Sequence, residues 1–182
     1  MDFYEVIEKR QSVRIYKTDP IPEDVLKRVL EAFRAAPSWA NTQPWELVLV
    51  TEEKIKQQLQ TTLSTNNPAS AAVTDAPIVV CPIGITGVSG FYRGNALTAR
   101  GDWMMFDLGI ATQQMALAAA AEGLGTVHVG AFDYQKAGQI LNLPQDRTVI
   151  ELIPLGYPAY TPRKVPRKPL EEFLFKNQYG QK

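Results

Sequence analysis

The stretch that most limits how this chain can fold runs from Met104 to Ala121 and reads MMFDLGIATQQMALAAAA. It predicts a long helix whose apolar side chains lie on most sides rather than along one stripe. Other elements must cover a helix of this kind, so we expect it to be central and buried. It contains polar residues and falls short of the ~20 apolar residues of a bilayer span, so we do not expect it to cross a membrane.

Segments typical of strands alternate with segments typical of helices along the rest of the chain. Strands are expected at residues 46–50, 77–85, 126–132 and 147–156, and further helices directly after Asp2 and at residues 22–36, 52–63 and 133–142. The glycine-rich residues 87–103 show no periodicity, and we expect a long mobile loop there. The alternation favours helices layered against a sheet, in an α/β or α+β fold.

No repeat, low-complexity tract or linker divides the sequence, so residues 1–182 are expected to form one domain. Four prolines punctuate the end of the chain, at positions 158, 162, 166 and 169. Because proline interrupts regular structure, residues 157–182 are expected to run as an extended arm along a surface.

The overall charge excludes some functions. Nineteen basic and nineteen acidic side chains cancel, which argues against a nucleic-acid binder or a protein of anionic membranes. The single cysteine, Cys81, cannot form an internal disulfide and lies in an apolar run where burial is expected. One cysteine and one histidine do not make a metal site. The N-terminus is charged from its second residue and is no signal peptide, so a soluble, cytoplasmic protein is expected.

The segment KRQSVRIY, residues 9–16, places two arginines around a serine. In an extended chain Arg10, Ser12 and Arg14 project to the same side and can converge on one small anion, such as a phosphate. The alternative is that both arginines pair with carboxylates such as Glu5 or Asp19. The chain has no GxxxxGK and no GxGxxG motif, so side chains would have to bind any phosphate.

Three further segments give the arginine pair a context. They are APSWANTQPW at residues 36–45, GLGTVHVGAF at residues 123–132, and LGYPAYTPRKVPRKPLEEF at residues 155–173. In this order and spacing the motifs resemble the nitroreductase family of flavoproteins, from Phe3 to Phe173. The arginine segment and the tail are also similar to the dehalogenating branch of that superfamily.

The resemblance implies an α+β fold with a central mixed sheet surrounded by helices, and a C-terminal arm exchanged in a homodimer. It also implies tightly, non-covalently bound FMN, with the 5′-phosphate held by Arg10, Ser12, Arg14 and Arg167. Family members often carry a lysine two positions before that last arginine. This chain has Val165 there, with Arg163 and Lys164 next to it, and of these two Lys164 is assigned as a cofactor contact. The implied cofactor contacts are Arg10, Gln11, Ser12, Val13, Arg14, Ser38, Asn41, Gln43, Val129, Gly130, Lys164 and Arg167.

The same resemblance places the backbone N–H groups of Val129 and Gly130 near the flavin N5 and O4. These atoms gain negative charge on reduction, and fixed dipoles beside them stabilise the reduced form. The flavin N5 carries the chemistry, so no catalytic side chain is assigned. His128 is expected to be a packed, hydrogen-bonded core residue rather than a proton donor.

Substrate selection is expected in the loop from Gly84 to Asp102, with Phe91, Tyr92 and Arg93 as contacts. Trp39 is expected to contact substrate or the partner subunit, and Trp45 to anchor its loop in the core. Met104, Met105 and Phe106 are expected to pack in the core.

The function expected from the resemblance is that of an oxidoreductase that takes hydride from NADH or NADPH. It would reduce small-molecule electrophiles, namely nitroaromatics, quinones or related conjugated compounds, by a ping-pong mechanism. The alternatives are a specialised reductive dehalogenase or flavin-degrading enzyme on the same scaffold, and a flavin-binding protein without turnover.

Overall fold

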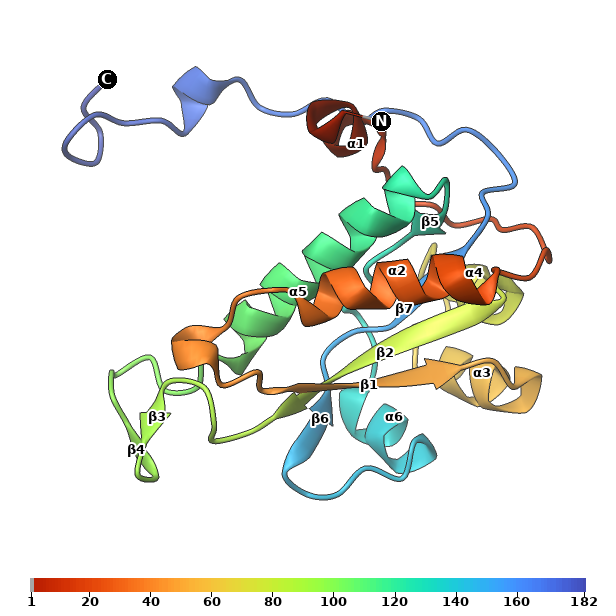
Figure 1. Cartoon of the computed structure of the whole chain (residues 1–182), viewed down its shortest axis with the longest axis horizontal. Helices are drawn as coiled ribbons and strands as arrows, with labels where there is room; N and C mark the ends of the chain where they lie inside the picture. Colours follow the sequence, from red (N-terminus) through yellow and green to blue (C-terminus); the bar gives the residue numbers. More distant parts are fainter. Residues whose placement is uncertain (1) are drawn as a thin grey trace.

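The computed structural model describes residues 2–182, in which helices cover both faces of a central sheet (Figure 1). The sheet contains β1 (Trp45–Val50), β2 (Ile78–Ile85), β5 (Gly125–Thr126), β6 (Arg147–Val149) and β7 (Ile153–Gly156). The helices are α1 (Phe3–Lys9), α2 (Glu23–Arg34), α3 (Glu53–Gln60), α4 (Ser70–Asp75), α5 (Met104–Ala121) and α6 (Tyr134–Ile140). This confirms the expected α+β architecture.

Strand β2 is the centre of the sheet. It pairs with β1 on one side and with β6 and β7 on the other, and β7 also pairs with β5. These pairings are all antiparallel, so the expectation of a mixed sheet was wrong for the named strands. The parallel contact in residues 2–182 is an isolated bridge between Ser12 and Thr126.

The two faces of β2 form two cores, as expected for a strand whose side chains alternate and are buried on both sides. Val79, Cys81 and Ile83 pack in a cluster with side chains of α3, α4 and α6. Ile78 and Val80 pack in a second cluster with α2 and α5. Burial raises the pKa of the Cys81 thiol to about 12, so this cysteine is an inert core residue, as expected.

Helix α5 is buried on one face only. Leu108, Ala111 and Met115 lie in the core, whereas Met105 and Phe106 are each 59% exposed. The expectation that Met104, Met105 and Phe106 all pack in the core was therefore right for Met104 alone. The sequence shows that most of the helix surface is apolar, but not which part the rest of the chain covers.

Several segments differ in extent from the sequence expectations. Residues 126–132 form no continuous strand, since beyond β5 the pairing there consists of isolated bridges, such as those of Val129 to Leu152 and of Phe132 to Leu63. The strand expected at residues 147–156 is broken into β6 and β7, and α4 was not foreseen. The loop of residues 87–103 contains a small hairpin, β3 (Phe91–Tyr92) and β4 (Asn95–Ala96).

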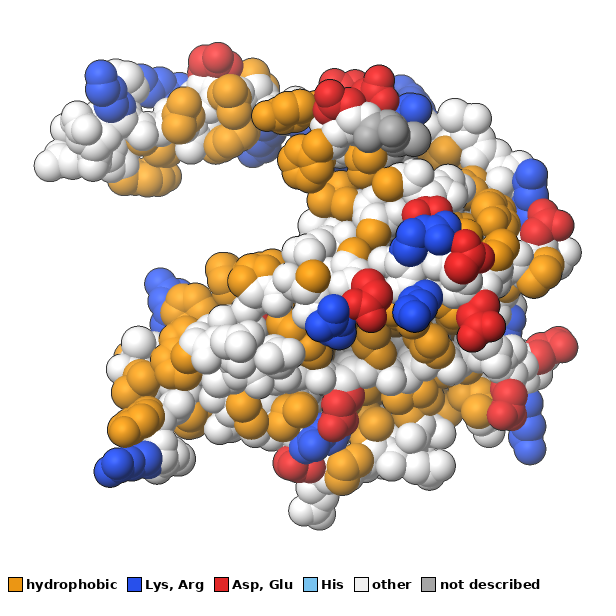
Figure 2. All heavy atoms as spheres, in the orientation of Figure 1, with side chains coloured by type: hydrophobic (Ala, Val, Ile, Leu, Met, Phe, Trp, Pro, Cys, Tyr) orange, Lys and Arg blue, Asp and Glu red, His pale blue; other side chains and the backbone are white. Residues whose placement is uncertain are grey.

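The C-terminal segment leaves the sheet beside the N-terminal one. Lys17 N donates to Tyr157 O (2.9 Å) and Ala159 N donates to Ile15 O (3.0 Å). Beyond these bonds the chain passes α1 and projects from the body, and Figure 2 shows a hollow between this arm and the rest of the molecule. The arm contains one short 3-10 turn, at Leu170–Glu172. Within residues 2–182, no helix has the length and apolar character needed to cross a bilayer.

Candidate functional site

The arginine segment is fixed by two buried residues. Val13 N donates to Thr126 O (2.9 Å), and the Val13 side chain packs directly on Gly125, where an added Cβ would lie 2.5 Å from Val13 Cγ2. The buried Tyr16 hydroxyl lies 2.7 Å from Val13 O and 3.1 Å from Pro154 O. With Val13 and Tyr16 turned into the core, Ser12 and Arg14 are left on the outer side of the segment.

The arm completes a cavity of about 350 Å³ over this segment. Its lining residues come from both ends of the chain and are Arg10, Gln11, Ser12, Arg14, Tyr160, Pro162, Arg163, Val165 and Arg167. Four of them are arginines. The expected phosphate contacts Arg10, Ser12, Arg14 and Arg167 thus share one cavity, and Gln11, Tyr160 and Arg163 lie there with them.

The charges of this cavity are not balanced by the protein. Among residues 2–182, none of these four arginines forms an ion pair, so the alternative pairing with Glu5 or Asp19 was wrong. Burial and then the nearby charge of Arg167 lower the pKa of Arg10. Arg14 Nε is buried and has no hydrogen-bond partner in the described part of the chain. Buried donors are normally satisfied, so the cavity fits an anion with several oxygen atoms, such as a phosphate group.

Lys164 lies outside the arginine cavity. Its Nζ is 3.4 Å from Glu8 Oε2, and it lines a neighbouring cavity with Arg10 and Arg167. Arg163, which sequence reasoning did not assign, takes the place in the arginine cavity that was expected for a second cation of the arm. Its position directly before Lys164 was visible in the sequence, but the direction of its side chain was not.

A second group of residues lies in the Ser38 loop, which we define as residues 37–44. Ser38 Oγ accepts a hydrogen bond from Gln43 N (2.8 Å), and Gln43 Nε2 donates to Asn41 Oδ1 (3.3 Å). Ala40, Asn41 and Gln43 have positive φ angles of 46°, 55° and 48°. Such conformations cost energy in residues other than glycine and tend to cluster at functional sites. Trp45 anchors the loop on Phe33, with ring centroids 5.5 Å apart.

Val129 and Gly130 differ in whether their backbone N–H group is available to a ligand. Val129 N donates to Leu152 O and Leu152 N donates to Val129 O, both at 3.0 Å. The N–H of Val129 is therefore already used, which corrects the expectation that it faces a flavin. Gly130 is exposed, an added Cβ there would meet no atom within 4 Å, and its N–H is directed to no acceptor among residues 2–182.

His128 is not a core residue. Its side chain is one-third exposed, and Nδ1 lies 2.7 Å from Glu151 Oε2. The expectation of a hydrogen-bonded histidine was correct, but that of a core position was wrong, because Val127 and Val129 on either side occupy the buried face. Within the described residues, no group of three or more His, Cys, Asp or Glu side chains is suited to hold a metal ion.

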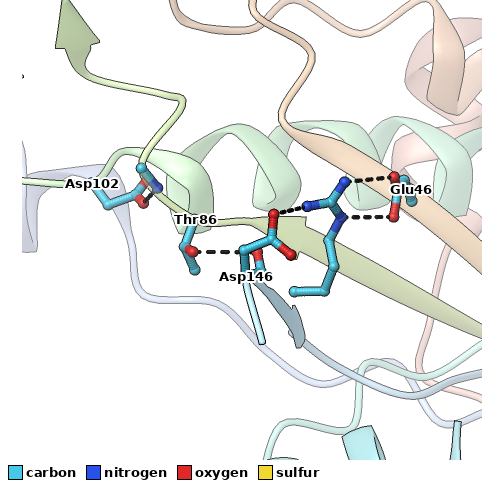
Figure 3. A network of polar contacts seen from close by, with 6 residues as sticks. Glu46, Thr86, Asp102 and Asp146 are labelled. Carbon is cyan, nitrogen blue, oxygen red and sulfur yellow. Dashed lines mark hydrogen bonds and ion pairs between the residues drawn. The ribbon is translucent and has the colours of Figure 1, made fainter. Parts of the chain in front are cut away.

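The expected substrate residues lie on the hairpin of the glycine-rich loop, which we define as residues 84–102. Arg93 lies over the ring of Tyr92, with Cζ 5.2 Å from the centroid, and both side chains are exposed. Hydrogen bonds hold the first residues of the loop in place. Thr86 Oγ1 donates to Asp146 O (3.2 Å) and Gly87 N donates to Asp102 Oδ2 (2.7 Å), beside the Arg147 ion pair with Glu46 (Figure 3).

Asp107 was missed by sequence reasoning. It is buried in the first turn of α5, where Oδ1 accepts from Trp39 N (3.1 Å) and Oδ2 accepts from Ser89 Oγ (2.6 Å). The available signal was that Asp107 is the one charged residue in an 18-residue apolar helix. Trp39 itself lies beside Trp103 and Phe106 in a pocket of about 250 Å³ at this end of α5.

The structure thus assembles the expected residues into separate groups. The arginine segment pairs with Thr126 and packs on Gly125, which follow α5, whereas the Ser38 loop contacts the first turn of α5. An 18-residue helix is about 27 Å long. In one chain, the two groups therefore lie near opposite ends of this helix, and the hairpin lies beyond the Ser38 loop (Figure 1).

Comparison with known proteins identifies the family of this chain. The family model described as "Nitroreductase family" matches residues 7–157. An NADH dehydrogenase of Thermus thermophilus is 31% identical over 191 residues, covering 91% of both chains. A nitroreductase family protein of Clostridium novyi has a solved structure with a TM-score of 0.78 and 30% identity, covering 100% of this chain and 96% of that one.

A solved iodotyrosine deiodinase bound to FMN and 3-iodo-L-tyrosine shares the fold, with a TM-score of 0.80 and 21% identity over 97% of this chain and 99% of that one. This likeness concerns the fold alone. The family model and the Thermus relative both span most of the sequence, and the resemblance seen in the motifs is confirmed: the chain belongs to the nitroreductase family of oxidoreductase enzymes.

Proposed function

We propose that this protein binds FMN and uses NADH or NADPH to reduce small conjugated electrophiles, such as nitroaromatics or quinones, in a ping-pong cycle. The observation that carries the proposal is the arginine cavity. It gathers four cationic side chains that have no carboxylate partner among residues 2–182, and one of them has a buried N–H that none of these residues accepts. The solved deiodinase of the same fold is bound to FMN.

Each group of residues has a proposed role toward the cofactor. Arg10, Arg14 and Arg167 would hold the phosphate, with the Ser12 hydroxyl as a further donor. The N–H of Gly130 would approach the flavin ring, where the absence of a side chain permits close contact. Ser38, Asn41 and Gln43 would contact the ribityl chain and the ring. Bound FMN supplies the hydride chemistry, so the chain needs no acid or base of its own.

The separation of these groups supports a homodimer. One FMN cannot bridge the arginine cavity and the Ser38 loop of the same chain if they lie near opposite ends of α5. A second copy would bring its own Ser38 loop to the first copy's arginine cavity. We therefore propose two FMN sites, each built from both chains, and a C-terminal arm that wraps the partner.

An exposed apolar face supports the same assembly. Phe3, Met105, Phe106 and Ile110 line a groove of about 920 Å³ along α5 and α1. This groove faces solvent in the single chain, and large exposed apolar patches are typical of interfaces. An obligate dimer of this kind is expected to bury more than ~2,000 Å².

The absorbance spectrum of the purified protein tests the proposal. Bound oxidised flavin should give its visible bands, and anaerobic NADH or NADPH should bleach them. Addition of a nitroaromatic or quinone should restore them with turnover. Turnover only with halophenols would identify the dehalogenase alternative, and a flavin that nicotinamides do not reduce would identify the non-catalytic one. A protein that takes up no FMN would overturn the proposal.

A further inference from the structure

We infer that Asp107 is a positioning residue that couples the Ser38 loop to the glycine-rich loop. Its two carboxylate oxygens each accept one hydrogen bond, and the two donors belong to different loops. Oδ1 accepts from the backbone N–H of Trp39 in the Ser38 loop, and Oδ2 accepts from the Ser89 hydroxyl in the glycine-rich loop. These segments are about fifty residues apart in the sequence. They meet at this side chain and, where both join the sheet, at the backbone hydrogen bond from Ile85 N to Pro44 O (3.0 Å).

The environment of Asp107 keeps the carboxylate in this geometry. The residue is 2% exposed, and no Lys, Arg or His among residues 2–182 pairs with it. Its position in the first turn of α5 places it at the positive end of the helix dipole, which favours a carboxylate. An ionised carboxylate can only accept hydrogen bonds, so both donors must point toward it.

Ser89 is fixed as firmly as Asp107. It is fully buried, and its carbonyl oxygen accepts from Trp103 N (3.1 Å). The next residue, Gly90, has φ +82°, and an added Cβ there would lie 2.6 Å from Trp103 Cδ1. The glycine-rich loop is therefore pressed against Trp103, which directly precedes α5, and this contact aims the Ser89 hydroxyl at Asp107.

A disturbance of one loop should therefore reach the other through Asp107. Without the Ser89 hydroxyl, Oδ2 would be a buried charged oxygen without a donor, which is costly. The carboxylate would then turn toward another donor, and the Trp39 N–H would lose its acceptor. In functional terms, which rest on the proposed function, closure of the glycine-rich loop on an electron acceptor would be transmitted to the loop that contacts the flavin.

Asp102 provides a matched control. It ties the glycine-rich loop to α5, because Oδ2 accepts from Gly87 N (2.7 Å) and Oδ1 accepts from Met104 N (2.8 Å). It makes no hydrogen bond to the Ser38 loop. Asp102→Ala should therefore loosen the glycine-rich loop alone, whereas Ser89→Ala should loosen both loops.

Hydrogen–deuterium exchange on the full-length protein as purified measures this difference. Loss of one hydrogen bond of ordinary strength should speed local exchange about five- to tenfold. We expect Ser89→Ala and Asp107→Ala to speed exchange in residues 38–43 and in residues 86–101, and Asp102→Ala to do so in residues 86–101 only. Asp107→Asn keeps an acceptor for Trp39 N–H and an amide that can donate to Ser89 Oγ, so it should restore slow exchange in residues 38–43.

Two results would overturn the inference. One is that residues 38–43 exchange at the wild-type rate in Ser89→Ala. The other is that Asp102→Ala speeds their exchange as much as Ser89→Ala does. If Ser89→Ala does not fold, the contrast between Asp107→Ala and Asp107→Asn decides, because equally fast exchange in both would exclude the hydrogen bonds as the cause. Flavin content is measured on the same samples, so a colourless protein contradicts the proposed function without deciding the exchange result.

Discussion

Arg10 and Arg167 come from opposite ends of the chain and line the same cavity, where the charge of Arg167 contributes, after burial, to a lowered pKa of Arg10. Like charges held together without a counterion destabilise the folded protein, and they are retained where a ligand supplies the opposite charge. This relationship makes an anion site the simplest account of the segment KRQSVRIY.

Arg14→Ala or Arg167→Ala should weaken FMN binding by about 1.5–3 kcal/mol each, roughly ten- to more than a hundredfold, because each removes charge-assisted contacts. Titration of the FMN-free protein followed by flavin fluorescence measures the effect. Riboflavin, which lacks the phosphate, should bind weakly and equally to wild type and variants. Arg34→Ala serves as a control, since Arg34 is exposed and pairs with Glu31. Equal losses for riboflavin and FMN would show that the arginines support the fold instead.

Gly125→Ala should damage the same site through packing. The added methyl group would meet Val13 at 2.5 Å, so the arginine segment must move or the protein loses about 1–3 kcal/mol of stability. Urea denaturation and FMN titration report the two effects. The second substitution Val13→Ala makes room for the methyl group and should recover part of the FMN affinity. No recovery in the double variant would contradict this packing.

Tyr92→Ala or Arg93→Ala should change kcat/KM for the electron acceptor and leave FMN occupancy intact. Both residues lie on the exposed hairpin, and loops commonly carry specificity while the scaffold holds the cofactor. Steady-state kinetics with several acceptors, together with the flavin absorbance of each variant, tests this. Loss of flavin from either variant would place the hairpin in the cofactor site.

Two truncations separate the roles of the arm. A chain ending at Tyr160 lacks Arg163 and Arg167, and should lose both FMN and dimerisation. A chain ending at Pro169 keeps the arginines but lacks the exposed Leu170, Phe173 and Leu174, and should dimerise more weakly. Size-exclusion chromatography with absorbance detection measures both properties. A yellow, NADH-active monomer from the shorter chain would exclude the shared sites.

Glu122→Gln should lower Tm at neutral pH and have less effect in acid. Arg28 pairs with Glu122 through two contacts, Nε–Oε1 (2.7 Å) and Nη2–Oε2 (2.9 Å), and the hydrogen bonds from Arg28 lower the pKa of Glu122. A carboxyl group whose pKa is lowered in the folded protein contributes stability at pH values above its ordinary pKa of 4.5. This stability is lost as the pH falls through the pKa of the folded state. Thermal melts between pH 7 and pH 3 should show that the difference in Tm between wild type and Glu122→Gln shrinks below pH 4.5. A constant difference would contradict the linkage.

The sequence alone determined the features that depend on neighbouring residues. The positions of α1, α2 and α6 were readable from local spacing, and Asp2 and Asp133 each accept a hydrogen bond from a backbone N–H of the helix that follows. The alternation of Arg10, Ser12 and Arg14 was equally local. The order of the motifs was enough to identify the family.

The tertiary structure decided what depends on distant partners. Met105 and Phe106 are as apolar as Met104, but only the packing of the whole chain shows that they remain exposed. Val129 N–H is used because Leu152 pairs with it, and Asp107 gains its position from donors in two remote loops. The periodicity of a sequence indicates that a face is apolar, and the residue type indicates that a group can form a hydrogen bond. Which atoms cover that face or accept that bond is set by contacts between segments far apart in the chain, and no local pattern encodes them.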